Sequence, residues 1–338
     1  MAQLLTQTAF FEKYGIGKED FSKTKLTWKA LSDIYSDYLK KISDLETVAI
    51  SIFRSLSRLD HVHSVRYRIK DAEHLIEKII RKKIENPERE ITIDTYLTEI
   101  TDLIGIRVLH LFKDDWSAIH QDILSTWDLK EPVVAYYRTG DNIRVFEENQ
   151  CTPKEHRSGY RSIHYTIKCK LTKLETYAEV QVRTIFEEAW SEIDHTVRYP
   201  YDMNNPLLAQ YLLIFNRLAG SADEMGSFIL NLRNYFQKIQ EENKKINQEK
   251  EKAEQQLQDA INQLEISEKE KENLKDKLNQ VQYLQINTNT KFRTKPNFMP
   301  WMNAFNSVDN IFKAMEMANL TSDLLDDFGG DSEWFRKK

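Results

Sequence analysis

Residues 179–184 read Glu-Val-Gln-Val-Arg-Thr, and upstream residues 159–164 read Gly-Tyr-Arg-Ser-Ile-His. Side chains alternate between the two faces of a strand, so Glu179, Gln181 and Arg183 are expected on one face, with the two valines in a core. Three polar groups on one open sheet face are a plausible catalytic platform, although an ordinary half-solvated strand pair has the same pattern. These stretches predict a pair of strands around which the rest of the chain can be interpreted.

Apolar residues recur with a period of two in some segments of the chain and at helical spacing in others. Together these segments predict an α+β fold, a mixed β-sheet flanked by helices. The predicted strands are 102–109, 131–138, 161–169 and 175–183, and the predicted helices are 25–60, 69–83, 115–126, 184–198 and 206–236.

A long helix is expected in the C-terminal half. Apolar or small residues recur at heptad spacing from Leu232 to Val281, with Glu, Lys and Gln at the outer positions, which is typical of a coiled coil. Polar residues such as Asn243 and Lys250 weaken the seam. A homo-oligomer formed through this helix, an intramolecular hairpin and an isolated charged helix are all compatible with it, and we favour pairing.

These patterns divide the chain into four segments. An N-terminal helical segment is expected at 1–60, the sheet-containing domain at 61–230, the coiled coil at 231–284, and a tail at 285–338. The tail is acidic and aromatic, which suggests a regulatory or partner-binding element.

The composition excludes several classes of protein. A net charge of −5 over 338 residues argues against strong non-specific nucleic-acid binding. Two cysteines are too few for a disulfide framework or a cysteine-based zinc site. No apolar run is long enough to span a membrane, and no secretory leader is recognisable, so we expect a cytoplasmic protein without membrane contact.

Cations cluster in the segment after residue 67. Arg68 and Lys70 are followed by His74 and Lys78, and a helix here would place Lys70, His74 and Lys78 on one face. Cations near a helix N-terminus suit a polyphosphate, although a solvated basic face has the same composition.

A second cluster, Asp102-Leu103-Ile104-Gly105-Ile106-Arg107, enters the first predicted strand. Carboxylate oxygens are ligands that Mg²⁺ prefers, so Asp102 is a candidate magnesium ligand. Gly105 leaves space beside Arg107, whose guanidinium could stack on a base. A helix cap or a strand-edge charge would explain Asp102 equally well.

Taken in order, these motifs resemble the synthetase domain of the RelA/SpoT family over residues 61–199. The resemblance rests on 68–78, 102–107, 159–164, 179–184 and a following helix that bears His195. It implies a nucleotidyltransferase-like fold. It also implies a Mg²⁺-dependent pyrophosphokinase that transfers pyrophosphate from ATP to the ribose 3′-hydroxyl of GDP or GTP, making (p)ppGpp.

The resemblance also implies roles for individual residues. Asp102 and Glu179 look like the Mg²⁺-binding pair, with Glu179 placed to activate the acceptor hydroxyl. Cationic residues would bind ATP and a second group would bind the acceptor, supported by polar neighbours of Glu179. The ATP-binding residues would be Arg68, Lys70, His74, Lys78 and Arg107; the acceptor-binding residues Tyr160, His164 and Arg157; the supporting residues Gln181, Arg183 and His195.

The chain departs from the family pattern in three places. His74 stands where the family usually has Ser, and the loop before Gly159 differs, so Arg157 could replace Lys154 as a contact to the acceptor phosphates. The residues before the first motif are too few for the family's hydrolase domain, so no hydrolase activity is expected.

Two other functions stay open at this level. The acceptor could be an adenine nucleotide or the 3′ end of tRNA, as in toxin-like members of the family. Alternatively, the domain could be a catalytically inactive nucleotide sensor or scaffold, which the presence of both Asp102 and Glu179 disfavours.

Overall fold

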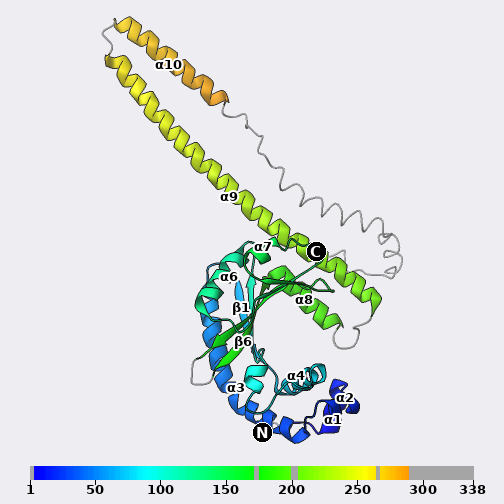
Figure 1. Ribbon diagram of the computed structural model, residues 1–338. Helices are drawn as coiled ribbons and strands as arrows, with labels where there is room; N and C mark the ends of the chain where they lie inside the picture. Colours follow the sequence, from blue (N-terminus) through cyan, green and yellow to red (C-terminus); the bar gives the residue numbers. More distant parts are fainter. Residues whose placement is uncertain (1–3, 171–174, 199–204, 264–266, 289–338) are drawn as a thin grey trace, which may run out of the picture. The chain divides into compact units, whose positions relative to one another are not determined.

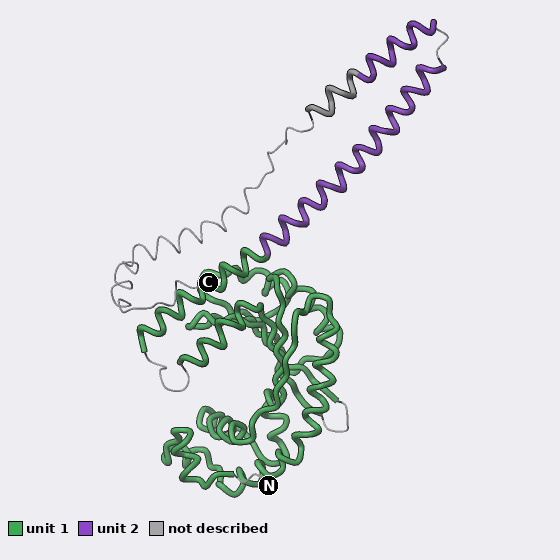
Figure 2. The backbone as a smooth tube through the Cα atoms, turned by 180° about the vertical axis from the view of Figure 1, so that it is seen from behind, with its two compact units in different colours: residues 1–226 green, residues 227–338 purple. Residues whose placement is uncertain are grey.

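The computed structural model describes residues 4–170, 175–198, 205–263 and 267–288. The chain divides into two compact units, Met1–Gly226 and Ser227–Lys338 (Figure 2). All of the residues that the sequence proposes for chemistry lie in the first unit. Most of the tail predicted at 285–338 lies outside the described residues.

The predicted mixed sheet is present, and in the described part of the chain it has six strands. Strand β2 pairs in parallel with β6, and β3 pairs in parallel with β4, whereas the other neighbours are antiparallel. In spatial order the strands are β1 (Ser64–Ile69), β2 (Ile104–His110), β6 (Thr176–Thr184), β5 (Ser162–Cys169), β3 (Val134–Tyr137) and β4 (Thr152–Glu155).

Helices cover both faces of this sheet. Helices α3 and α6 lie on one side and α8 on the other (Figure 1). The helices that lie entirely within the first unit are α1 (Gln7–Tyr14), α2 (Lys18–Lys23), α3 (Trp28–Leu56), α4 (Ala72–Glu85), α5 (Tyr96–Glu99), α6 (Asp115–Thr126), α7 (Arg144–Glu148) and α8 (Ile185–Arg198).

The core lies between the sheet and helices α3 and α6. Alternate residues of the central strands, such as Ile106, Val180 and Tyr165, are fully buried, and Tyr165 accepts a hydrogen bond from Trp116 Nε1 of α6 at 3.0 Å. Because strand side chains alternate, the residues between them face the opposite side of the sheet, toward α8. That second face carries the polar residues of the sequence motifs.

Two strands were not predicted from the sequence. Strand β1 contains the alternating Val65, Tyr67 and Ile69, but none of its side chains is deeply buried, so its apolar face is weak. Strand β4 is a short edge strand that contains Pro153, a residue normally confined to sheet edges. Both follow from pairing with a neighbour rather than from local pattern.

The helix predicted at 69–83 begins later, at Ala72. The side chain of Asp71 caps it by accepting hydrogen bonds from the backbone N–H groups of Glu73 and His74 at 2.9 and 3.1 Å. Residue Ile69 ends β1, and Lys70 lies between strand and helix. The prediction that Lys70 belongs to this helix was therefore wrong.

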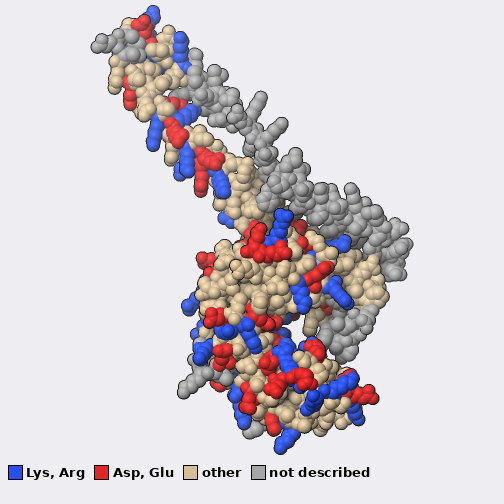
Figure 3. All heavy atoms as spheres, viewed as in Figure 1, with Lys and Arg blue, Asp and Glu red and all other residues tan. Residues whose placement is uncertain are grey.

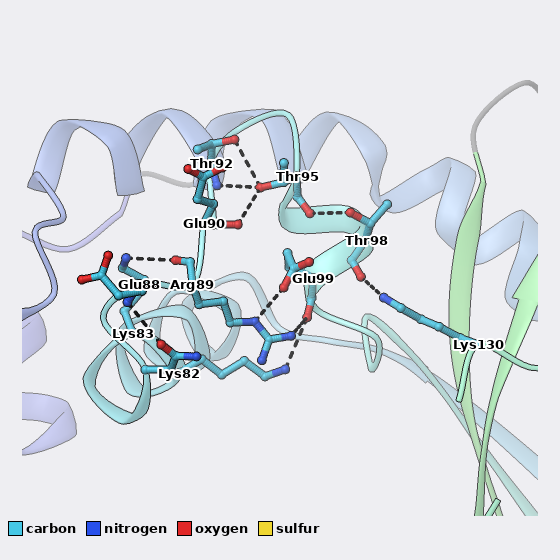
Figure 4. A network of polar contacts seen from close by, with 11 residues as sticks. Lys82, Lys83, Glu88, Arg89, Glu90, Thr92, Thr95, Thr98, Glu99 and Lys130 are labelled. Atoms are coloured by element: carbon cyan, nitrogen blue, oxygen red, sulfur yellow. Dashed lines mark hydrogen bonds and ion pairs between the residues drawn. The ribbon is translucent and has the colours of Figure 1, made fainter. Parts of the chain in front are cut away.

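A polar network (Figure 4) fixes the segment between α4 and β2, in which Asp102 lies. Arg89 Nε pairs with Glu99 Oε2 at 2.6 Å, and Lys82 Nζ donates to the Glu99 carbonyl at 3.3 Å. Lys83, which is buried, donates to backbone carbonyls of the same segment, including that of Arg89 at 2.9 Å. Lys82 and Lys83 of α4 thus hold the loop that carries Asp102 through its backbone carbonyls.

The long C-terminal helix is confirmed as α9 (Pro206–Gln263), and a further helix, α10 (Glu268–Thr288), follows. The predicted helix is not continuous, because Ser267 is a non-helical residue whose backbone N–H and hydroxyl both donate to Glu270 Oε2, as in a capping box. Apolar residues such as Ile246 and Leu257 are exposed on α9. The coiled coil stays a prediction.

Candidate functional site

The polar face of the sheet brings three of the sequence motifs together by register. Arg68 of β1 lies opposite Gly105 of β2, and Gly105 lies opposite Glu179 of β6. The Arg68 side chain lies over the glycine, because a Cβ on Gly105 would be 3.3 Å from both Cγ and Nε of Arg68. Gly105 therefore makes room for the arginine between two neighbouring strands.

Asp102 lies just before β2 and is held by two lysines. Lys70 Nζ and Lys78 Nζ both contact its Oδ2, at 2.8 and 2.6 Å. Its side chain is only 11% exposed; burial opposes ionisation, but the two ammonium groups outweigh it and lower the pKa of Asp102. The other oxygen, Oδ1, is buried and has no hydrogen-bond partner. Asp102 is therefore a carboxylate with one oxygen left for a further ligand.

The side chains of the Glu-x-Gln-x-Arg motif share one face of β6, as predicted, and hydrogen bonds link them in a row. Gln181 Nε2 donates to Glu179 Oε2 at 2.9 Å, and Arg183 donates to Gln181 Oε1 at 3.2 Å. His164 Nδ1 of β5 lies 3.4 Å from Glu179 Oε1. Burial raises the pKa of Glu179, but the contact with His164 outweighs it and the net shift is downward. Glu179 is therefore ionised near neutral pH.

Arg107 is held by carboxylates of α8. Its guanidinium contacts Glu188 Oε1 at 3.0 Å and also Glu192, and Glu188 in turn pairs with Arg183 Nε at 2.8 Å. Burial opposes the charge of Arg107, but the two carboxylates outweigh it and raise its pKa. The sequence did not identify Glu188 or Glu192, because their role depends on how α8 packs over the sheet.

A cavity of about 280 Å³ lies over this part of the sheet. Arg68, Gly105, Arg107, Glu179 and Gln181 line it. The two arginines proposed to flank a base therefore share a cavity with the proposed catalytic carboxylate.

A larger cavity, of about 1230 Å³, lies next to β5 and the first turns of α9. Every residue proposed for the acceptor lines it, namely Arg157, Tyr160 and His164, and His195 lines it as well. Lys154 also reaches this cavity, so the altered loop before Gly159 brings both of its cations to the same space.

Aromatic rings make one wall of this larger cavity. Tyr160 precedes β5 rather than belonging to it, yet its hydroxyl lies 3.1 Å from His164 Nε2. Tyr136 of β3, which the sequence did not single out, packs on the His164 ring with centroids 4.8 Å apart. Burial raises the pKa of Tyr160, so its hydroxyl stays protonated. His164 therefore connects Tyr160 to Glu179 through its two ring nitrogens.

His74 does not join the Asp102 cluster. Its ring packs edge-on against Tyr14 of α1 and lies 3.8 Å from Asp71, with the side chain 60% exposed. The prediction that Lys70, His74 and Lys78 share one helix face was wrong for Lys70, which precedes α4. His74 is in the helix, but its ring contacts Tyr14, whereas both lysines contact Asp102.

No grouping of three or more His, Cys, Asp or Glu side chains suitable for a metal ion occurs within the described ranges. Nor does any helix in those ranges have the length and apolar character that a membrane span requires.

Comparisons with known proteins match the same part of the chain that carries the sequence motifs. Residues 67–204 match the family described as the region found in RelA / SpoT proteins. The curated GTP pyrophosphokinases YjbM and YwaC of Bacillus subtilis (strain 168) are 24% identical over 211 residues and 22% identical over 192 residues. These alignments cover 60% and 56% of this chain, and 88% and 82% of those proteins. The crystal structure of small alarmone synthetase 1 from Bacillus subtilis matches with 20% identity and a TM-score of 0.40, covering 60% of this chain and 95% of that one.

The predicted resemblance is therefore confirmed. Residues 67–204 match the model of the region found in RelA / SpoT proteins, and the two curated GTP pyrophosphokinases align with the chain over the same part.

Proposed function

We propose that this chain, through its RelA/SpoT region, transfers pyrophosphate from ATP to the ribose 3′-hydroxyl of GDP or GTP. One contact carries the proposal: Glu179 lines the smaller cavity, His164 lines the larger one, and their side chains meet at 3.4 Å. A donor nucleotide in one cavity and an acceptor in the other would have their reacting groups on either side of this pair.

The smaller cavity suits the donor. Arg68 and Arg107 line it, and guanidinium groups stack favourably on planar bases. Lys70 and Lys78, beside Asp102, would contact the polyphosphate, since ammonium groups neutralise phosphate oxygens. Binding would require Arg107 to exchange its contact with Glu192 for the base.

The larger cavity suits the acceptor. Tyr160 offers a ring on which a guanine could stack, and Lys154, His156 and Arg157 offer groups for its phosphates. Mixed charge rather than one extended basic patch covers the face shown in Figure 3, which agrees with a nucleotide acceptor better than with tRNA.

The residues present fit a magnesium ion. Asp102 and Glu179 would hold it, because both are ionised carboxylates and Asp102 Oδ1 is buried without a partner. With only two protein carboxylates, the remaining ligands would come from phosphates and water, as is usual for Mg²⁺. When bound, the ion would neutralise negative charge on the transferring group.

The side chains then account for the transfer. Glu179 accepts the proton of the 3′-hydroxyl, whose oxygen forms a bond to the β-phosphorus of ATP while the bond from that phosphorus to the α–β bridging oxygen breaks, releasing AMP. His164 holds the Glu179 carboxylate toward the larger cavity. Arg183, through Gln181, holds it from the other side. Positioning and charge neutralisation supply most of what such a reaction needs.

The test is transfer of label from [γ-³²P]ATP in the presence of Mg²⁺, with GDP, GTP, AMP and tRNA offered separately. We expect labelled GDP and GTP products, and a loss of about 10²- to 10⁴-fold in Glu179→Gln. Glu148→Gln, which removes an exposed carboxylate on α7, is the matched control and should keep full activity.

Label on tRNA or AMP alone would replace the guanine acceptor with another. If none of the acceptors is labelled, the proposed enzymatic activity is refuted and a nucleotide sensor is favoured.

A further inference from the structure

The turn that precedes Tyr160 has a backbone conformation that needs glycine. Gly159 has φ +77°, and its N–H donates to the His156 carbonyl at 2.9 Å, which closes the turn. A Cβ at this position would lie 2.9 Å from Oδ1 of Asn216, closer than such contacts are found. The turn is therefore built against one side chain of α9.

Asn216 is 2% exposed and uses both ends of its amide. Its Nδ2 donates to the Gly159 carbonyl at 2.9 Å, and its Oδ1 accepts from Arg138 at 3.2 Å. Arginine can only donate, so the amide oxygen must face Arg138 and the amide nitrogen must face Gly159. Arg138 is itself held by Asp141 at 3.3 Å. The donor on Arg138 and the acceptor on Gly159 thus fix the orientation of the amide.

The next residue after this turn is Tyr160, whose ring faces the larger cavity. The ring lies 5.4 Å from the His156 ring, and the Arg183 guanidinium lies 5.6 Å from its centroid. Helix α9 also supplies Ala209, Gln210 and Leu213 to the wall of the same cavity. One helix therefore both lines the cavity and anchors the turn that presents its main aromatic ring.

From these contacts we infer that Asn216 is a positioning residue for the acceptor: it holds the Gly159 turn so that the Tyr160 ring stands ready to stack on the acceptor base. The inference rests on the proposed function and deepens it. Asn216 touches no substrate and acts through Gly159 and Tyr160. It therefore affects the acceptor half of the site, while the donor cavity over β1, β2 and β6 stays as it is.

The informative variant is Asn216→Asp. It keeps the size of the side chain and an oxygen toward Arg138, but it places a second oxygen against the Gly159 carbonyl, where no donor remains. We expect kcat/KM for the acceptor to fall about 10-fold or more, mainly through KM, while the KM for ATP changes less than about 2-fold. Asn234→Asp, the same change at an exposed position of the same helix, should leave both constants unchanged.

A merely structural role for Asn216 would give a different result. Equal losses for ATP and for the acceptor, or unchanged kinetics for both, would overturn the inference. The thermal unfolding midpoint of each variant, measured in parallel, identifies any sample that has failed to fold; in that event Asn216→Ser, which removes the amide without adding charge, is put through the same measurements.

Failure of the proposed function can be told apart from failure of this inference. Wild-type transfer to GDP or GTP tests the function and does not involve Asn216. If the wild type uses neither acceptor, crystal structures of the wild type and Asn216→Asp decide the inference alone. The contact between the Tyr160 hydroxyl and His164 Nε2, 3.1 Å in the wild type, should be lost. A turn unchanged in the variant would overturn the positioning role.

Discussion

Replacing Gly105 by alanine should raise the stability of the protein while lowering its transfer activity. Gly105 lies in the middle of three strands, opposite Arg68 on one side and Glu179 on the other. A Cβ there would be 3.3 Å from Cγ and Nε of Arg68. The obstacle is a flexible, exposed side chain rather than backbone, so Arg68 can move by a few tenths of an ångström and the sheet can keep its register.

The two effects of this change have opposite signs. Glycine in a strand interior is less stable than alanine by roughly 0.5–1 kcal/mol, so Gly105→Ala should raise the free energy of unfolding by about that amount. Displacing Arg68 should weaken the stacking on the donor base that we propose for it, an interaction typically worth ~0.5–2 kcal/mol. That corresponds to a loss of about 2- to 30-fold in kcat/KM for ATP.

Chemical denaturation gives the free energy of unfolding, and initial rates of transfer at varied ATP give kcat/KM. Gly226→Ala is the matched control, because a Cβ on this helical glycine would be in ordinary contact with Phe112 Cδ1, at 3.9 Å. It should gain similar stability without any change in ATP kinetics. A Gly105→Ala variant that gains stability and keeps wild-type kcat/KM for ATP would show that the space above Gly105 does not position Arg68 for the donor.

Three further outcomes are expected from charged groups of the first unit. His164→Gln removes the contact that lowers the pKa of Glu179, so the acid limb of the pH–rate profile should move to higher pH; an unmoved limb would exclude Glu179 as the titrating base. Burial and then the charge of Glu187 raise the pKa of Asp223 to about 7, so the folded chain binds this proton more tightly than the unfolded one. Stability of the wild type relative to Asp223→Asn should therefore fall as pH rises from 3.8 through about 7, as measured by urea unfolding, and a flat difference would contradict this. Chelation with EDTA should stop transfer but leave the thermal unfolding midpoint unchanged, because Lys70 and Lys78 already compensate Asp102; a lowered midpoint would mean that the metal is part of the fold.

Strand periodicity made much of the site predictable. Once 179–184 is a strand, Glu179, Gln181 and Arg183 must share a face, and the structure shows them linked in a chain. The same holds for Gly105 and Arg107 of β2, which share that face while Ile104 and Ile106 are buried. These features depend on neighbouring residues of a single element, so local pattern is sufficient.

Features that depend on packing between distant elements could not be predicted from the sequence. The carboxylates that hold Arg107 come from α8, and nothing in the spacing of Glu188 and Glu192 indicates that α8 covers this strand. The Asp71 cap starts the helix after Lys70, and the His74 ring packs against Tyr14 of α1, a contact that helix periodicity does not predict. Asn216 lies 57 residues after Gly159, within a helix whose sequence shows no motif.

The charges of the donor half are paired with one another, which explains how a buried polar site can exist before substrate binds. An isolated carboxylate as buried as Asp102 would lose its hydration at a cost of several kcal/mol and would take up a proton instead. Lys70 and Lys78 keep the Asp102 carboxylate charged, and Glu188 and Glu192 compensate the positive charge of Arg107. The proposed nucleotide binding would exchange partners instead of desolvating bare charges, with phosphates replacing Asp102 beside the lysines and a base replacing a carboxylate beside Arg107. The site is therefore held in its charged, ordered state by the same side chains that the proposed reaction uses.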